Sequence, residues 1–121
     1  MEFKIFGKYQ NIALVVTDEL LIHDVESAMQ LITTVKKGVN CRKFIISKSC
    51  VQDDFFSPAT KYTAEVLRKY VNSHIQIAIV GDYSCFEGQP TMTFLNNINR
   101  GDRIFFTNDM DEAIKRLEVD I

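Results

Sequence analysis

Short apolar runs recur along the chain and predict five strands. Residues 2–6 predict a first strand and residues 11–16 (NIALVV) a second, joined by a turn into an N-terminal hairpin. Three more runs, rich in β-branched and aromatic residues, predict strands at 43–47 (KFIIS), 76–80 (QIAIV) and 103–106 (RIFF). Continuous apolar runs of this length are typical of strands that are buried on both faces of a sheet.

Amphipathic segments with helical spacing lie between these strands. The clearest start is Ser57-Pro58, where a capping hydroxyl precedes a proline at the first helical position, so we expect a helix from there to about Ser73. Three other helices are predicted: one from about Asp24, its N-cap, to Lys37 with Gly38 as its stop, one over 90–100, and one after an Asn108 cap. Each predicted helix therefore connects or follows a predicted strand.

The order of these segments predicts the fold class. The order is β-β-α-β-α-β-α-β-α, and strands that alternate with amphipathic helices indicate an α/β fold with a mostly parallel central sheet. The hairpin adds an N-terminal strand to that sheet. The 121 residues are the size of one domain, and no repeat or linker divides them, so we expect a single α/β domain over 1–121.

Composition and charge narrow the function classes. The formal net charge is −2 and the pI is about 5.6, so nothing indicates the basic surface of a nucleic-acid-binding protein. No apolar run approaches the ~18 residues of a membrane span, and the N-terminus lacks a signal-peptide pattern, which predicts a cytoplasmic protein away from membranes. Cys41, Cys50 and Cys85 are an odd number without CxxC spacing and are expected to be reduced thiols.

Polar and aromatic residues follow the third and fourth predicted strands, and the site is expected there. Mostly parallel sheets usually bind ligands at the carboxyl ends of their strands. The candidate residues for binding a partner or a ligand are Lys48, Asp53, Asp54, Phe55, Asp82, Tyr83 and Ser84. The Phe55-Phe56 pair and Phe86 are open to two interpretations, packing in the core or exposed contacts for a partner.

This end of the sheet is expected to be acidic. Asp and Glu gather at the predicted helix starts and Lys and Arg at the helix ends, an arrangement that the helix dipole by itself accounts for. A negative face suits a cation or a basic partner surface and disfavours nucleotide phosphates. The motifs of phosphate loops, dinucleotide-binding folds, esterases and zinc proteases are absent, so we assign no catalytic residue, cofactor or metal ligand.

Several segments carry a resemblance to a known family. They are LIHDVESAMQLITTV, IISKSCVQDDFF, AEVLRKYVN, IAIVGDYS, NRGDRIFF and DEAI. With them the chain resembles, over nearly its whole length, a bacterial family known as domain of unknown function 4180. The most specific parts of the resemblance are residues 47–56 (SKSCVQDDFF) and 80–84 (VGDYS). The resemblance implies a bacterial protein and no particular activity.

The element order is also similar to that of the STAS domain, the fold of anti-sigma-factor antagonists. That resemblance implies a phosphorylation switch at a serine that starts the helix after the third strand, and Ser57 stands at the corresponding position. The chain departs from the serine-glycine pattern of STAS switch sites, because Pro58 follows Ser57. A role as a helix N-cap explains Ser57 without a switch.

Two hypotheses of function follow from these patterns. The first, which we favour, is a non-enzymatic regulatory or protein-interaction module that docks an unidentified partner at residues 53–57 and 82–86. The second is an enzyme or binding domain for a small molecule or a divalent metal, which uses Asp53, Asp54 and Asp82 together with Lys48 or Ser84. A cleft where these side chains converge would favour the second hypothesis. A homodimer that covers an edge strand or an apolar patch is a further hypothesis.

Overall fold

The chain folds into a five-stranded sheet with helices on both faces, and the computed structural model describes residues 1–119. The strands are β1 (Glu2–Phe6), β2 (Ile12–Val16), β3 (Lys43–Ser47), β4 (Gln76–Val80) and β5 (Ile104–Thr107). The α-helices are α1 (Val25–Val39), α2 (Tyr62–Asn72), α3 (Pro90–Asn99) and α4 (Met110–Glu118). Three short 3-10 turns are η1 (Lys48–Cys50), η2 (Asp53–Phe56) and η3 (Ser84–Phe86). This order confirms the predicted α/β fold class.

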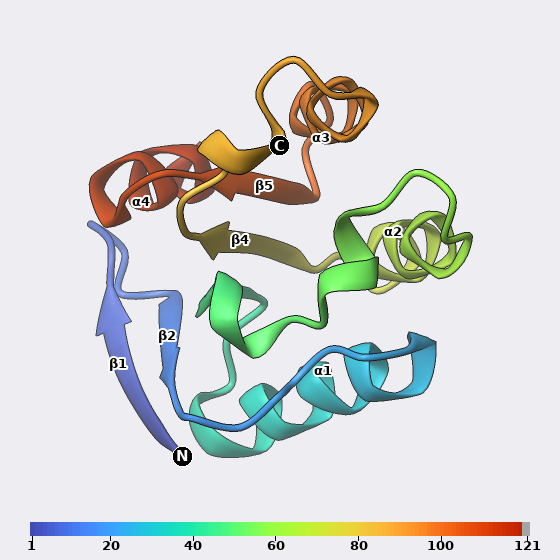
Figure 1. Cartoon of the computed structure of the whole chain (residues 1–121). Coiled ribbons are helices and arrows are strands. Elements are labelled where there is room, and N and C mark those ends of the chain that lie inside the picture. Colours follow the sequence, from blue (N-terminus) through green and yellow to red (C-terminus); the bar gives the residue numbers. More distant parts are fainter. Residues whose placement is uncertain (120–121) are drawn as a thin grey trace.

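The strands lie in the sheet in the order in which they occur in the chain. β1 pairs antiparallel with β2, and β2, β3, β4 and β5 are parallel neighbours. Right-handed crossovers between sequential parallel strands place the connecting helices on one face of the sheet. Figure 1 shows α1, α2 and α3 together on one side of the sheet and α4 on the other. The carboxyl ends of the four parallel strands therefore lie together at one end of the sheet.

Two apolar clusters fill the two faces of the sheet. The larger cluster lies against α1, α2 and α3 and includes Phe44, Ile46, Ile77, Ile79 and Phe106. The smaller cluster lies against α4 and includes Ile12, Ile45, Ala78, Phe105 and Leu117. Successive side chains of a strand point to opposite faces, so β3, β4 and β5 contribute to both clusters, as their continuous apolar runs predict.

Helix α1 begins where predicted and ends later than predicted. The Asp24 carboxylate accepts a hydrogen bond from the Ser27 backbone N–H (2.7 Å), and Ser27 Oγ accepts one from the Asp24 backbone N–H (3.1 Å). The predicted stop at Gly38 is wrong, because the helix continues to its cap Asn40, which has a left-handed backbone (φ 54°). Gly38 instead makes room for the Phe3 ring, since a Cβ on Gly38 would lie 2.5 Å from Phe3 Cε2.

The predicted helix start at Ser57 is also wrong. Ser57 ends η2, and a hydrogen bond from the Thr60 N–H to the Ser57 carbonyl (3.2 Å) closes a separate turn there. Helix α2 begins only at Tyr62. The Thr63 hydroxyl in its first turn donates to the Phe55 carbonyl (2.6 Å), which ties the start of the helix to η2. The proline therefore lies in the connecting turn rather than at the first helical position.

The cap of α4 is Asp109 rather than the predicted Asn108. Asp109 has an extended backbone, and its carboxylate accepts a hydrogen bond from the Glu112 N–H (2.8 Å). A carboxylate at this position both caps the helix and interacts favourably with its dipole.

The helices are short compared with a helix that spans a bilayer. The longest helix, α1, has 15 residues, and a bilayer-spanning helix needs about 20 mostly apolar ones. Within residues 1–119, no helix has the length and apolar character that would let it cross a membrane.

Candidate binding face at the carboxyl ends of the strands

Connections that leave three neighbouring strands build the candidate face. η1 and η2 follow β3, and η3 follows β4. The loop after β2 is attached to the η1 segment, because the N–H groups of Leu21 and Ile22 both donate to the Cys50 carbonyl (2.7 and 3.1 Å). The Gln52 N–H then donates to the Ile22 carbonyl (2.8 Å). These backbone bonds join the connections into one supported surface.

Lys48 links the β3 and β4 connections. Its Nζ donates a hydrogen bond to the Asp82 carbonyl (2.7 Å), and its stem passes directly over Gly81. Three aromatic ring centres lie within 5.8 Å of the ammonium, those of Phe56, Tyr83 and Phe86. This distance allows cation–π attraction. Within residues 1–119 no salt bridge joins Lys48 to a carboxylate. The Asp82 carbonyl and the aromatic rings therefore stabilise the Lys48 ammonium.

A buried aromatic cluster lies beneath this surface. Phe55, Phe56 and Tyr83 are only 0%, 1% and 5% exposed. The Phe56 ring packs edge-to-face against Phe55 (5.8 Å between ring centres) and Tyr83 (5.9 Å), and Phe106 of β5 contacts all three. Phe55 and Tyr83 are two of the candidate residues for binding a partner or a ligand, and for Phe55 the burial agrees with the interpretation as core packing. Because their rings are buried in the core, they support the surface from inside.

Three carboxylates are exposed on the face, those of Asp53, Asp54 and Asp82. The Tyr62 hydroxyl donates to Asp54 Oδ1 (2.7 Å), and the Ser84 N–H donates to Asp82 Oδ1 (2.9 Å). The bond from the Ser84 N–H, then a bond from its hydroxyl, and then the nearby Lys48 charge hold the pKa of Asp82 below its ordinary value. Asp54 and Asp82 therefore present their carboxylates in fixed orientations.

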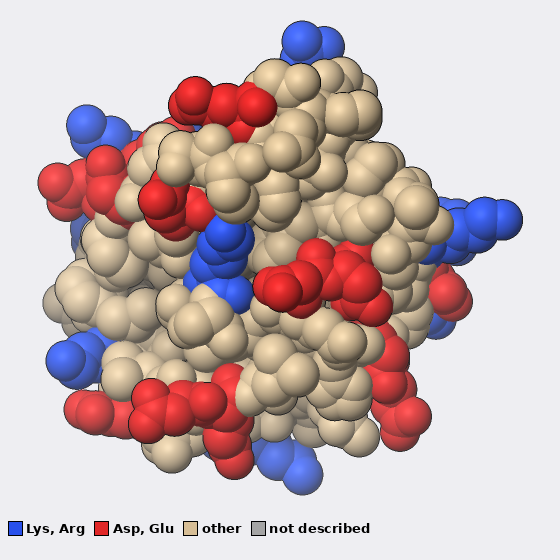
Figure 2. Space-filling model, viewed as in Figure 1, with Lys and Arg blue, Asp and Glu red and all other residues tan. Residues whose placement is uncertain are grey.

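This side of the molecule carries both acidic and basic groups. Figure 2, in the view of Figure 1, shows separate acidic groups around one basic group near the middle of the visible face. The ammonium of Lys48 is already engaged by a carbonyl and by rings. The face therefore offers carboxylates, rather than a free ammonium, to an incoming group.

Ser57 lies at the edge of this face and is half-buried. Its Oγ accepts a hydrogen bond from the Ala59 N–H (3.2 Å) within the turn. Because α2 begins at Tyr62, Ser57 is not at a helix N-terminus. A phosphate on Ser57 would lack the stabilisation that a helix dipole gives at an N-cap position.

The carboxylates do not converge on a common point. Within residues 1–119, no group of three or more His, Cys, Asp or Glu side chains is arranged to hold a metal ion. Among five hollows in the surface of residues 1–119, none is lined by Asp53, Asp54 or Asp82. Asp53, Asp54 and Asp82 therefore line none of these five hollows and form no such group of ligands within residues 1–119.

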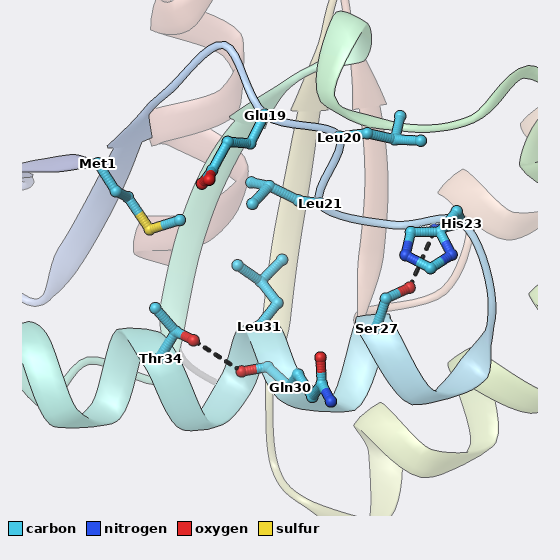
Figure 3. A pocket seen from close by; sticks show the side chains of 9 residues that line it. All are labelled: Met1, Glu19, Leu20, Leu21, His23, Ser27, Gln30, Leu31 and Thr34. Carbon is cyan, nitrogen blue, oxygen red and sulfur yellow. Dashed lines mark hydrogen bonds between the residues drawn. The ribbon is translucent and has the colours of Figure 1, made fainter.

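One hollow of about 220 Å³ lies between the loop over residues 19–23 and α1 (Figure 3). Several of its polar residues belong to α1 and make local hydrogen bonds there. Ser27 Oγ accepts a hydrogen bond from the His23 N–H (2.9 Å), and Thr34 Oγ1 donates to the Gln30 carbonyl (3.0 Å). The His23 ring lies 3.4 Å from the Asp24 carboxylate. These are local contacts at the start and in the body of α1.

Two residues that shape the face escaped the sequence analysis. Gly81 admits the Lys48 stem, and Tyr62 orients Asp54. The signal for Gly81 was its place directly after a parallel strand, where a glycine often marks the close approach of another group. No pattern identifies Tyr62, because its contact depends on where α2 begins.

Comparisons with known proteins give a family and a fold. The model of a family described as "domain of unknown function (DUF4180)" matches residues 8–117. No curated protein matches the chain. The solved structure of a candidate anti-sigma factor antagonist from Thermotoga maritima is similar over 98% of this chain and 94% of its own, with a TM-score of 0.50 and 16% identity. This likeness confirms the STAS-like architecture and, at this identity, shows the fold alone.

Proposed function

Because the chain belongs to the family described as domain of unknown function (DUF4180), whose name assigns no activity, we propose a function from the candidate face. The protein is a non-enzymatic regulatory module that binds a protein partner through Asp53, Asp54, Asp82 and Ser84, with Lys48 held between them. One observation carries this proposal: the exposed carboxylates of Asp54 and Asp82 are held in fixed orientations over a buried aromatic cluster and line none of the five hollows.

The fixed geometry of the acids supports binding rather than catalysis. The Tyr62 hydroxyl orients Asp54, and the Ser84 N–H orients Asp82. Side chains that are already ordered lose less conformational entropy when a partner binds, so more of the interaction energy appears as affinity. Catalysis would instead need groups that converge around a reacting atom.

The chemistry of the face defines the kind of partner. Exposed carboxylates attract lysine and arginine, and an arginine can form two parallel hydrogen bonds with one carboxylate. Complementary charge also speeds encounter and rejects acidic surfaces. The partner surface is therefore basic. The candidate anti-sigma factor antagonist with a similar fold supports a regulatory role by analogy.

We also propose that this binding takes place in the cytoplasm. Cys41, Cys50 and Cys85 are free thiols in the structure. Free thiols persist in reducing compartments such as the cytoplasm, whereas oxidising compartments favour their conversion to disulfides.

A capture experiment tests the proposal. Tagged wild-type protein and the Asp54→Lys/Asp82→Lys variant are incubated with extract of the source cells, and bound proteins are identified by mass spectrometry. Each substitution replaces a negative charge by a positive one and so raises the net charge by two, from −2 to +2 for the pair. We expect one basic-surfaced protein to be captured by the wild type and lost with this variant.

A matched variant controls for net charge. Glu26→Lys/Asp102→Lys carries the same net charge but changes exposed acids in the first turn of α1 and in the connection that follows α3. This variant should capture the partner as the wild type does. Two results would show that the candidate face is not the binding surface. The Asp54→Lys/Asp82→Lys variant could capture as much partner as the wild type, or the control variant could lose as much of it as the Asp54→Lys/Asp82→Lys variant does.

A further inference from the structure

The two edges of the sheet are treated differently by the chain. At β5, the Asn99 side chain of α3 pairs with the backbone of Phe106: the Phe106 N–H donates to Asn99 Oδ1 (2.6 Å), and Asn99 Nδ2 donates to the Phe106 carbonyl (3.2 Å). The Arg116 guanidinium in turn donates to the Asn99 carbonyl (2.5 Å). An amide that copies the bonds of a neighbouring strand closes this edge to any other strand.

Within the described residues 1–119, no side chain covers the opposite edge, β1, in this way. Figure 1 shows β1 at the outside of the sheet, with only β2 beside it. Within residues 1–119, no hydrogen bond reaches the backbone of residues 2–6 from outside the β1–β2 pair. Apolar side chains are partly exposed here as well, because Ile5 of β1 is 41% exposed and Met1, which precedes β1, is 55% exposed. The outer backbone groups of β1 are therefore available to a further strand.

The sequence of β1 is complementary to itself in one antiparallel register. A two-fold axis through the sheet places residue i of one copy opposite residue 6 − i of the other and keeps both faces of the sheet aligned. Glu2 then faces the partner's Lys4 twice, on the face that Val16 and Leu14 share. On the other face, Phe3 meets its own copy and Met1 meets the partner's Ile5. The two neighbouring face-preserving registers instead oppose Lys4 to Lys4 or Glu2 to Glu2.

We propose that β1 is a dimerisation edge, which joins two copies of this chain into one continuous ten-stranded sheet. The occupant is a second copy because charge and apolar positions match in this register and in neither neighbour. Phe3 positions the edge, since its ring packs on Gly38 of α1 and holds β1 against the body of the domain. The association does not involve the acidic face, so it stands or falls independently of the proposed function.

Lys4 has a simpler interpretation that the experiment must separate from this one. A lysine in a short edge strand often serves only to prevent pairing with other chains. A lysine with that role disfavours pairing with any strand. A lysine that takes part in pairing instead favours an acidic residue opposite it. Charge exchange between copies distinguishes the two roles.

The test measures the mass of the species in solution by sedimentation and light scattering, from about 10 µM to about 1 mM protein, a range that reveals a weak pair. Wild-type protein should shift from monomer to dimer. Glu2→Lys and Lys4→Glu alone should each weaken the dimer by about tenfold or more, because like charges then face each other twice. An equimolar mixture of the two variants should associate again, since each new charge in one variant faces an opposite charge in the other.

Lys36→Glu is the matched control for Lys4→Glu, because it makes the same change of charge at an exposed position of α1. It should dimerise as the wild type does. Circular dichroism of every variant verifies that the sheet has formed. Three results would each overturn the proposal: a monomeric wild type throughout the concentration range, a dimer that both single variants retain, or variants that stay monomeric when mixed.

Discussion

Lys48 and Gly81 are in such close contact that a Cβ on Gly81 would lie 2.4 Å from the Lys48 Cβ. The absence of that one atom lets the Lys48 stem cross from the β3 connection to the β4 connection. The ammonium then reaches the Asp82 carbonyl, and the two connections become one surface. The candidate face therefore depends on a glycine that takes no part in binding.

Gly81→Ala is expected to destabilise the protein, because the new methyl group meets a carbon close to the Lys48 backbone rather than the end of a flexible side chain. Overpacking of this kind costs about 1–3 kcal/mol of unfolding free energy. Urea denaturation measures the effect. In a Lys48→Gly background the same substitution should cost much less, because the clashing Cβ is gone; an equal cost in both backgrounds would contradict the contact.

The acid stability of the protein should depend on Asp82. The Ser84 N–H, its hydroxyl and the Lys48 charge lower the pKa of Asp82 in the folded state. A carboxylate with a lowered folded pKa stabilises the fold above its unfolded pKa of about 3.9, and that stability is lost as the pH falls through the folded pKa. We therefore expect Asp82→Asn to flatten the fall in unfolding free energy between about pH 5 and about pH 2.

Urea unfolding at several pH values checks this expectation. Asp53→Asn is the control, because the Asp53 carboxylate accepts no hydrogen bond from residues 1–119. Asp24, whose pKa is lowered chiefly by the Ser27 N–H, continues to contribute in every variant. A pH dependence that is identical in Asp82→Asn and wild type would show that Ser84 and Lys48 do not stabilise the Asp82 carboxylate.

Tyr70 joins α2 to α1, and its loss should be felt across that interface. The ring is fully buried, burial raises the pKa of its hydroxyl, and the hydroxyl donates to the Ala28 carbonyl (2.9 Å). Tyr70→Phe removes only this bond, so we expect a loss of about 1–2 kcal/mol in chemical denaturation. Tyr9→Phe, at a site that is 60% exposed, should leave stability unchanged. Equal effects from the two substitutions would contradict the interhelical bond.

The three thiols should differ in reactivity. Cys85 is exposed beside Lys48 (4.0 Å from Sγ to Nζ), whereas burial raises the pKa of both Cys41 and Cys50. A thiol reagent should modify one equivalent quickly in the folded protein and the rest only after unfolding, since thiolates react and buried thiols are inaccessible. Cys85→Ser should abolish the fast phase. A fast phase that persists in this variant would place an exposed thiol elsewhere.

Much of the fold could be predicted from the sequence, because β3 and β4 are short apolar runs that contain β-branched or aromatic residues, a pattern that favours strands over helices. The errors fell where a local signal competed with a tertiary contact. Ser57-Pro58 has the chemistry of a helix start, yet the Thr63 hydroxyl and the Phe55 carbonyl set the start of α2. Gly38 has the chemistry of a helix end, yet it serves the packing of Phe3.

The candidate site was predictable in outline only. Polar residues after parallel strands identified the connections, but burial separated their members. Phe55 and Tyr83 follow strands just as Asp54 and Asp82 do, and only the three-dimensional packing shows that the rings lie inside and the carboxylates outside. Whether neighbouring side chains converge into a cleft also depends on loop geometry, on which the sequence gives no pattern.

Site-specific photocrosslinking in the source cells tests the central claim, a protein partner on the candidate face, most directly. A photoreactive residue replaces Gln52, which is exposed next to Asp53 and is not one of the proposed binding residues, and in a second protein it replaces Lys69, exposed in the last turn of α2. We predict one protein adduct from position 52 and none from position 69. No adduct from position 52, or the same adducts from both positions, would contradict the account.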